Sequence, residues 1–209
     1  NLIRLILEPD ARLEDEVPSY LLSEISKIGN AHEIFSALAD GHARYRDILS
    51  QSHVSSGATL VNVLNRLIGM QLVQRRTPIN DPNNKKRTSY VICDGLSKFY
   101  YRYVFRYLSQ RSVLDPEVFY DRYVNDDFET QFVPHAFEEV CRQYLVRQNR
   151  MGNIEPPFDL IGAYSYDDPA TRTNGEFDVV TRDPLGYAFY EAKFRSTPIT
   201  QRMIEDEVE

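Results

Sequence analysis

The chain has 209 residues, of which 42% are hydrophobic and 26% are charged, and its formal net charge is −7. This length is enough for one large domain or two small ones, each with its own core. No apolar run reaches the roughly 20 residues of a membrane span, and no basic and then apolar leader opens the chain, so we expect a cytoplasmic protein without a membrane segment.

Residues 1–30 contain two short apolar helical patterns, LIRLILE and SYLLSEISKI, separated by the acidic stretch EPDARLEDEVP. The prolines of that stretch break any continuous helix. The chain begins with Asn1 and ends within EDEVE, which has helical composition. We therefore expect a fragment, with residues 1–30 as a helical lead-in from a missing N-terminal domain.

Residues 31–96 predict a compact helical domain that ends in two strands. HEIFSALADG, RYRDILSQS and SSGATLVNVLNRLIGMQ each have helical periodicity, and LVQRRTPI and TSYVICD have the composition of strands. The loop between the strands is rich in Asn, Asp and Pro. Three helices followed by a hairpin is the order of a winged helix-turn-helix domain.

The third of these helices and the tip of the hairpin carry the residue types that contact DNA. Groove contacts are expected from the polar face of the helix, and phosphate contacts from the basic hairpin tip. The candidates are Thr59, Asn62, Asn65 and Arg66 on the helix and Lys85, Lys86 and Arg87 at the tip. The alternative is a regulatory or protein-binding module in which these polar side chains are only solvated.

A basic centre lies within the acidic chain, because residues 66–111 hold ten Lys or Arg but only two Asp. Part of it is a helical stripe of Lys98, Arg102 and Arg106 at spacings of four residues. The stripe predicts either a contact with nucleic acid or a packed connecting helix within residues 97–130. Charge asymmetry of this kind also serves docking between domains.

Residues 131–209 predict a helix, a strand, a hairpin and the start of another helix. The expected helix is FVPHAFEEVCRQYLVRQNR, with one face (Phe137, Val140, Cys141, Tyr144 and Leu145) inside and Glu138 or Glu139 near its N-terminal turn. The strand lies within PPFDLIGAYSYDD and the hairpin within GEFDVVTRDPLGYAFYEAKF. The overall expectation is an α+β protein.

The hairpin places three charged residues among apolar ones. If the turn spans residues 183–186, pairing runs from 182 with 187 back to Asp178 with Glu191, and Lys193 shares a strand face with Glu191. Two carboxylates so close repel each other unless a cation such as Mg²⁺ lies between them. The lysine would then orient or help to deprotonate an attacking water. A bulged turn is the alternative and would set Asp178 opposite Ala192.

Asp178, followed after a short hairpin by Glu191, Ala192 and Lys193, is similar to the PD-(D/E)xK motif of restriction-endonuclease-like nucleases. The resemblance implies Asp178 and Glu191 as metal ligands, Lys193 as the catalytic lysine and Glu138 as the helix carboxylate. Glu176 replaces Asp178 if the register differs. The last domain would then have an α/β restriction-endonuclease-like fold that is truncated at its C-terminus.

The whole layout resembles the C-terminal region of archaeal-type ATPases of the P-loop AAA class. In these chains a lead-in like EDEVPSYLLSEI leaves the ATPase domain, a winged helix like HEIFSALADGHARYRDILSQS follows, and a nuclease-like domain of unknown function ends the protein. The resemblance implies the ATPase domain of the same chain as a partner. No G-x-x-x-x-G-K-[ST] phosphate loop occurs here, so we expect ATP to bind only in the missing domain.

Three interpretations remain open. In the first, the chain is a Mg²⁺-dependent DNA endonuclease recruited by its winged helix. In the second, the nuclease fold is catalytically inactive and serves DNA binding or regulation of the ATPase. In the third, Lys193 neutralises Glu191 and Asp178 in a purely structural ion pair.

Overall fold

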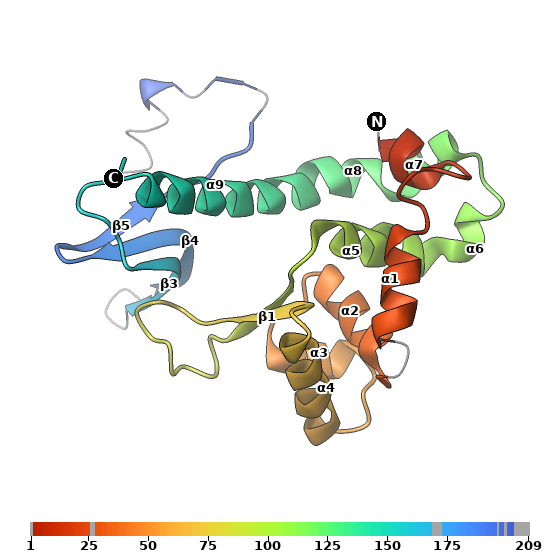
Figure 1. The fold of residues 1–209 in the computed structure, drawn as a ribbon, viewed down its shortest axis with the longest axis horizontal. Helices are drawn as coiled ribbons and strands as arrows, with labels where there is room; N and C mark the ends of the chain where they lie inside the picture. The colour runs from red at the N-terminus through yellow and green to blue at the C-terminus, as the bar shows by residue number, and fades with distance from the viewer. Residues whose placement is uncertain (1, 26–27, 169–172, 196, 199, 203–209) are drawn as a thin grey trace.

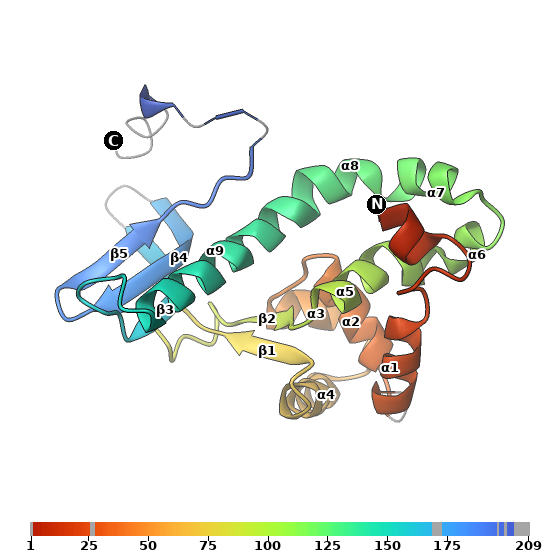
Figure 2. The same cartoon turned by 45° about the horizontal axis from the view of Figure 1, so that its top comes forward.

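The computed structural model describes residues 2–25, 28–168, 173–195, 197–198 and 200–202. These residues form an α+β structure of helices and two small antiparallel sheets. In Figures 1 and 2 the 18-residue helix α9 (Val133–Arg150) runs between a helical half and a three-stranded sheet. No described helix has the length and hydropathy needed to cross a membrane.

The predicted order of three helices and two strands is confirmed. The elements are α2 (Ala31–Ala39), α3 (Tyr45–Gln51), α4 (Gly57–Gly69), β1 (Val73–Arg76) and β2 (Ser89–Ile92). The Ser56 hydroxyl caps α4 by accepting a hydrogen bond from the Thr59 amide at 3.1 Å. We call these five elements the three-helix unit.

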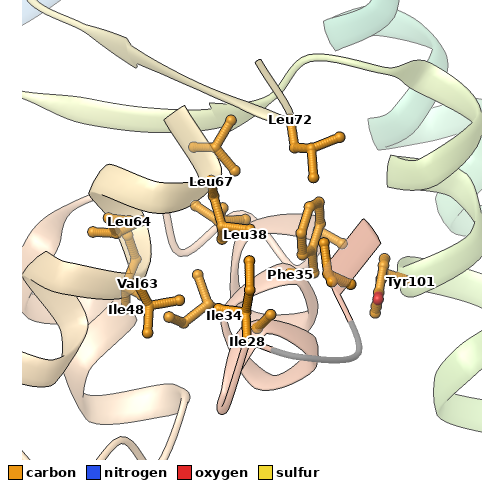
Figure 3. Packing of buried hydrophobic residues seen from close by; sticks show 14 of the residues in the cluster. Ile28, Ile34, Phe35, Leu38, Ile48, Val63, Leu64, Leu67, Leu72 and Tyr101 are labelled. Carbon is orange, nitrogen blue, oxygen red and sulfur yellow. The ribbon is translucent and has the colours of Figure 1, made fainter. Parts of the chain in front are cut away.

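The three-helix unit owes its stability to one apolar cluster. The side chains of Ile34, Leu60 and Leu67 are completely buried in it, because the apolar stripes of α2 and α4 face each other. Figure 3 shows Leu64 and Leu67 on α4 close to the side chains of α2. Burial of each such side chain contributes about 1.5–3 kcal/mol, which fixes the helix that carries the predicted DNA-reading residues.

A second, aromatic-rich cluster joins the N-terminal segment to the middle of the chain. Phe99, Tyr103 and Phe119 are its most buried aromatic side chains, and Ile6 and Leu7 pack beside them. Its elements are η1 (Ile3–Leu7), α5 (Gly95–Phe99), η2 (Tyr100–Val104), η3 (Phe105–Tyr107), α6 (Leu108–Arg111), α7 (Pro116–Tyr123), α8 (Asn125–Asp127) and η4 (Phe128–Phe132). Helix α1 (Glu16–Ile25) connects this cluster with the three-helix unit, where Ile25 is buried.

Helix α9 packs on a sheet with the strand order β3-β4-β5. The strands are β3 (Leu160–Asp168), β4 (Thr173–Asp183) and β5 (Gly186–Tyr190). The predicted inner face of α9 is partly wrong, since Val140 is 58% and Tyr144 60% exposed. One side of α9 meets the sheet and the other has no apolar layer against it in the described part of the chain, so the apolar spacing does not coincide with burial.

The hairpin register follows the turn predicted from the sequence. Asp183 pairs with Gly186 and Arg182 with Tyr187, while the Asp183 carboxylate accepts hydrogen bonds from the amides of Leu185 and Gly186. The alternative register of the bulged turn is not observed. The ladder ends at Val179 with Tyr190, so the expected pairing of Asp178 with Glu191 is not part of it.

A β-bulge in β4 changes the direction of the strand at Asp178. Gly162 of β3 pairs with Val180, but Tyr164 pairs with Phe177, so Asp178 and Val179 both stand opposite Ala163. Such a bulge interrupts the alternation of side chains and redirects those of the bulged strand. Nothing in the turn sequence predicts it.

The loop between β1 and β2 docks on the free edge of β3. The Ile79 amide donates to the Ala163 carbonyl at 2.8 Å, and the Asn80 side chain bonds both backbone groups of Ser165, at 2.8 and 3.1 Å. A Cβ at Gly162 would lie 2.8 Å from the Ile79 Cγ2, so only glycine allows this approach without a shift. The loop therefore covers part of the edge of β3 and joins the three-helix unit to the sheet.

Candidate functional site

Two hollows flank the β1–β2 hairpin. The first, which we call the cationic groove, has a volume of about 700 Å³ and lies between α3, α4 and the hairpin loop. Five cations line it, namely Arg44, Arg46, Arg75, Lys85 and Lys86, while Asp47 is its one acidic residue within the described structure. The groove therefore carries a strong positive charge in a chain that is acidic as a whole.

The local fold presents these cations at the groove. The Asn84 side chain accepts hydrogen bonds from the amides of Lys86 and Arg87 at 3.0 and 3.2 Å, which shapes the loop that carries both residues. Arg44 in turn donates to the Lys86 carbonyl at 3.3 Å. The lysine side chains at positions 85 and 86 remain exposed to solvent.

The predicted DNA-contacting residues of α4 are only partly in the groove. Asn65 lines it together with Lys85 and Lys86. Asn62 and Arg66 are exposed on α4 outside the groove, and the Thr59 hydroxyl lies 2.9 Å from that of Ser56 at the helix start.

The predicted basic stripe on the connecting helix lies elsewhere. Arg102 donates two hydrogen bonds to Asp127, at 2.6 and 2.7 Å, and a third to the Ala39 carbonyl at 2.9 Å. Arg106 forms an ion pair with Asp40. Both arginines are therefore paired with carboxylates of the same chain.

The second hollow, which we call the carboxylate cavity, has a volume of about 620 Å³. It lies between the other side of the hairpin, helix α9 and the bulged part of β4. Its acidic residues are Glu138 and Glu139 from α9 and Glu176 and Asp178 from β4. The structure thus brings together the predicted helix carboxylate, Glu138, and both predicted carboxylates of β4.

One of these carboxylates is fully neutralised. Glu139 pairs with Arg76 of β1 at 2.8 Å and with Arg142 of its own helix. Burial by itself raises the pKa of Glu139, but the two guanidinium groups hold that pKa below its ordinary value. Arg142 also donates to the Asp178 carbonyl at 2.8 Å and so links α9 to the bulge.

Glu138 and Glu176 are less strongly compensated than Glu139. Burial, and then the charge of Asp178, raise the pKa of Glu138, although His135 at 3.3 Å acts in the opposite direction. Burial and Asp178 also raise the pKa of Glu176, which Arg44 and Arg87 partly offset. Burial and the charge of Asp178 together thus disfavour the ionised forms of Glu138 and Glu176.

Glu191 and Lys193 do not line this cavity in the described part of the chain. They follow the end of β5, and the Lys193 ammonium lies 4.0 Å from the Glu191 carboxylate, which is 58% exposed. Within the described residues, no three Asp, Glu, His or Cys side chains are arranged to hold a metal ion. The predicted triad of Asp178, Glu191 and Glu138 is therefore not assembled in this structure.

Sequence reasoning missed several cavity residues that come from distant parts of the chain. Lys98, predicted in the basic stripe, lines the cavity instead and lies over the Phe132 ring at 5.6 Å. Burial, and then Arg102, lower the pKa of Lys98. Arg142 could have been found from its position three residues after Glu139 on a helix, but no local pattern indicates Arg76 or Lys98.

Comparisons with known proteins give a family without an assigned function. The DUF234 family, described as archaeal and bacterial proteins of unknown function, matches residues 100–205. The "Uncharacterized protein MJECL04" of Methanocaldococcus jannaschii is 27% identical over 158 residues, which are 74% of this chain and 34% of that protein. The chain thus spans about a third of the length of this relative. No solved structure matches this chain.

Proposed function

Because the chain belongs to the DUF234 family of archaeal and bacterial proteins of unknown function, we propose its role from its own surfaces: it binds the DNA backbone through the cationic groove. The observation that carries this proposal is the presence of five Lys or Arg side chains against one carboxylate in that groove. Neutralising phosphates with such cations releases counterions and supplies the sequence-independent part of DNA affinity.

The arrangement of the three-helix unit supports the same proposal. We interpret it as a winged helix in which α4 is the third helix and the β1–β2 hairpin is the wing. The cationic groove lies between these two elements, where a winged helix would contact the duplex. In this interpretation Asn65 reaches base edges, while Lys85 and Lys86 hold phosphates and fix the orientation.

We further propose that this region works within a longer protein. The relative from Methanocaldococcus jannaschii is about three times as long as the stretch that it shares with this chain. An upstream ATPase domain, as the layout of the chain suggests, would supply the ATP-dependent step and would contact this region as a partner. DNA binding would then couple that step to its substrate.

The test is fluorescence anisotropy with a short labelled duplex over a range of salt concentrations. We expect the wild type to bind at low salt, and the double variant Lys85→Ala/Lys86→Ala to lose affinity and to reduce the salt slope by about 2. The matched control Arg122→Ala/Arg147→Ala removes two exposed cations outside the groove and should bind as the wild type does. Equal binding by both double variants, or no binding at low salt, would refute the proposal.

A second function is favoured by one specific observation. Glu138 and Asp178 line one cavity and are close enough for Asp178 to raise the pKa of Glu138. Two carboxylates with water and a phosphate oxygen are the usual ligands of Mg²⁺ in phosphoryl-transfer sites. We therefore propose metal-dependent cleavage of DNA as the second function, with the ion supplying charge neutralisation at the phosphate.

In this second function the predicted Glu191 and Lys193 would complete the site from the segment after β5. Mg²⁺ titration by calorimetry, with plasmid cleavage followed in the same samples, tests it on the wild type, Asp178→Asn and Glu191→Ala. Loss of both binding and nicking in Asp178→Asn supports the metal site, and the Glu191 variant shows whether the segment after β5 takes part. Absence of Mg²⁺ binding at millimolar concentration would leave a catalytically inactive fold that serves DNA binding.

A further inference from the structure

Five aromatic side chains form a continuous row across the three strands of the sheet. The ring centroids of successive members lie between 4.9 and 5.6 Å apart. We call this group the aromatic row, and its members in spatial order are Tyr187, Tyr164, Phe189, Phe177 and Tyr166. Contacts between aromatic rings on neighbouring strands stabilise a sheet, but they do not require that the rings remain open to solvent.

The aromatic row lies on the face of the sheet that points away from α9. Ile161, Ala163 and Glu176 line the cavity between the sheet and α9. Side chains alternate between the two faces of a strand, so Tyr164 and Phe177, each one residue further along, point to the opposite face. The row is therefore separate from the cavity on the α9 side of the sheet.

Most of the aromatic row is open to solvent. The exposed fraction is between 39% and 49% for Tyr166, Phe177, Tyr187 and Phe189. Single apolar residues are common on protein surfaces, whereas apolar residues that are gathered in one patch mark an interaction surface. The row thus has the character of a docking surface.

The shape of the aromatic row suits a flat group. A Cβ on Gly175 would lie 2.6 Å from the Tyr166 hydroxyl oxygen and 2.7 Å from its Cζ, so this ring fills the place of a side chain on the neighbouring strand. Ring faces of this kind stack with other planar groups. The planar candidates are a nucleobase, the aromatic row of a second copy of the chain, and the guanidinium group of arginine.

The charge of the sheet decides among these three occupants. Strands β3, β4 and β5 contain five acidic residues and one basic residue, Arg182, whose guanidinium already lies 2.8 Å from the Asp159 carboxylate. The resulting negative field repels the phosphates that accompany a nucleobase, and it repels the same face of a second copy across a two-fold axis. It attracts a guanidinium group, which is both cationic and planar.

We propose that the aromatic row docks an arginine-bearing segment of another protein, with guanidinium groups stacked on the rings of Phe177 and Phe189. Exposed carboxylates of the sheet region, such as those of Asp167 and Glu191, supply the longer-range attraction. Arginine is preferred to lysine, because the lysine ammonium is a point charge without a plane to stack. The row lines neither the cationic groove nor the carboxylate cavity, so the inference is independent of the proposed function.

The experiment uses labelled peptides of equal length in which arginine, lysine or the neutral analogue citrulline alternates with alanine. Fluorescence anisotropy measures their binding to the wild-type chain at low salt. The arginine peptide should bind in a saturable manner, about fivefold more tightly than the lysine peptide, and the citrulline peptide should bind most weakly. Added salt should weaken the arginine peptide, because it screens the attraction of the exposed carboxylates.

Two sheet variants and one control locate the binding site. Phe177→Leu/Phe189→Leu, the ring variant, keeps apolar side chains but removes two ring faces, and it should bind the arginine peptide about tenfold more weakly. Asp167→Asn/Glu191→Gln should also bind this peptide more weakly and with a smaller dependence on salt. The matched control Tyr144→Leu removes a ring on α9 that is 60% exposed, and it should bind as the wild type does.

Circular dichroism checks that each variant retains its fold. Should the ring variant lose its fold, the shifts that the arginine peptide induces in the Phe and Tyr ring resonances of the wild type locate the site instead. Shifts confined to rings outside the aromatic row would then overturn the inference.

The other possible results also overturn the inference, each for its own reason. No binding of the arginine peptide at millimolar concentration, equal affinity for the lysine peptide, or unchanged binding by the ring variant would exclude stacking of guanidinium groups on the row. A wild-type dimer in analytical ultracentrifugation that the ring variant does not form would assign the row to a second copy. Weaker binding of single-stranded DNA by the ring variant than by the wild type would assign it to nucleobases.

Discussion

Glu138 and Glu139 are adjacent on α9 but have opposite electrostatic surroundings. The pKa of Glu138 is raised above its ordinary value of 4.5 by burial and by Asp178, so the folded state favours its protonated form. The stability that this proton provides is complete below the ordinary pKa and is lost as the pH rises through the folded-state pKa. Glu138→Gln, which resembles the protonated form, should therefore be more stable than the wild type at pH 7, by less than about 1 kcal/mol at this half-exposed site.

Glu139 supplies the matched control, because its pKa is lowered in the folded state by Arg76 and Arg142 against the effect of burial. Its contribution to stability is present above the ordinary pKa of 4.5 and is lost as the pH falls through the folded-state value. Glu139→Gln should thus lose about 1 kcal/mol at pH 7 and approach the wild type in acid. Urea unfolding of both variants from acid to neutral pH measures the two trends, and trends of the same sign would contradict this assignment.

Asp127 holds a network of hydrogen bonds in the connecting helices. It accepts two bonds from the mostly buried Arg102 and one, at 2.6 Å, from the Tyr103 hydroxyl. The Arg102 hydrogen bond lowers the pKa of Asp127, although burial opposes the shift. Asp127→Asn should cost about 2 kcal/mol because Arg102 loses its counter-charge, while Asp121→Asn on the exposed side of α7 should cost almost nothing. Thermal unfolding of the two variants checks this, and equal melting temperatures would show that the network is unimportant for stability.

At the scale of elements, local patterns in the sequence predict the helices and the hairpin register well. Ser56 and the apolar spacing of residues 60–67 define α4, and Asp183 with Gly186 defines the turn between β4 and β5. The bulge at Asp178 was not predictable, because it depends on the pairing of β4 with β3 rather than on the sequence near Asp178. The exposure of Tyr144 has the same kind of cause, since only tertiary packing decides which side of α9 is covered.

Asn80 provides the side-chain contact between the hairpin loop and β3. Its side chain satisfies both the amide and the carbonyl of Ser165, so that Asn80→Ala leaves two backbone groups on this edge without their partner. We expect a loss of about 1–3 kcal/mol and faster hydrogen exchange at the Ser165 amide. Asn83→Ala, in the exposed part of the same loop, is the control and should leave the exchange unchanged. Unchanged protection in Asn80→Ala would mean that the docking of the loop is weak in solution.

At the scale of the whole molecule, the candidate site combines parts that the sequence predicts with parts that it does not. Glu138, Asp178 and Glu176 were expected at the site from the resemblance to the nuclease motif, and the structure places them in one cavity. Lys98 and Arg76 enter the same cavity from segments far earlier in the chain. The position of Lys98 and Arg76 in the cavity depends on the docking of the hairpin against α9 and β3, which no local sequence pattern predicts.

The same docking predicts how the molecule unfolds. The Asn80 bonds and the ion pair of Arg76 with Glu139 are two of the contacts that join the three-helix unit to the sheet and α9. The double variant Asn80→Ala/Arg76→Ala should therefore unfold in two steps, the sheet first, because the unit with the larger apolar core no longer stabilises it. Hydrogen exchange in increasing urea, followed separately for β4 and α4, measures the separation, with Asn83→Ala/Arg122→Ala as the control. In the wild type, β4 and α4 should lose protection together. If they also do so in both double variants, the coupling between the sheet and the three-helix unit lies in other contacts. The connecting helices with their aromatic cluster would then provide this coupling.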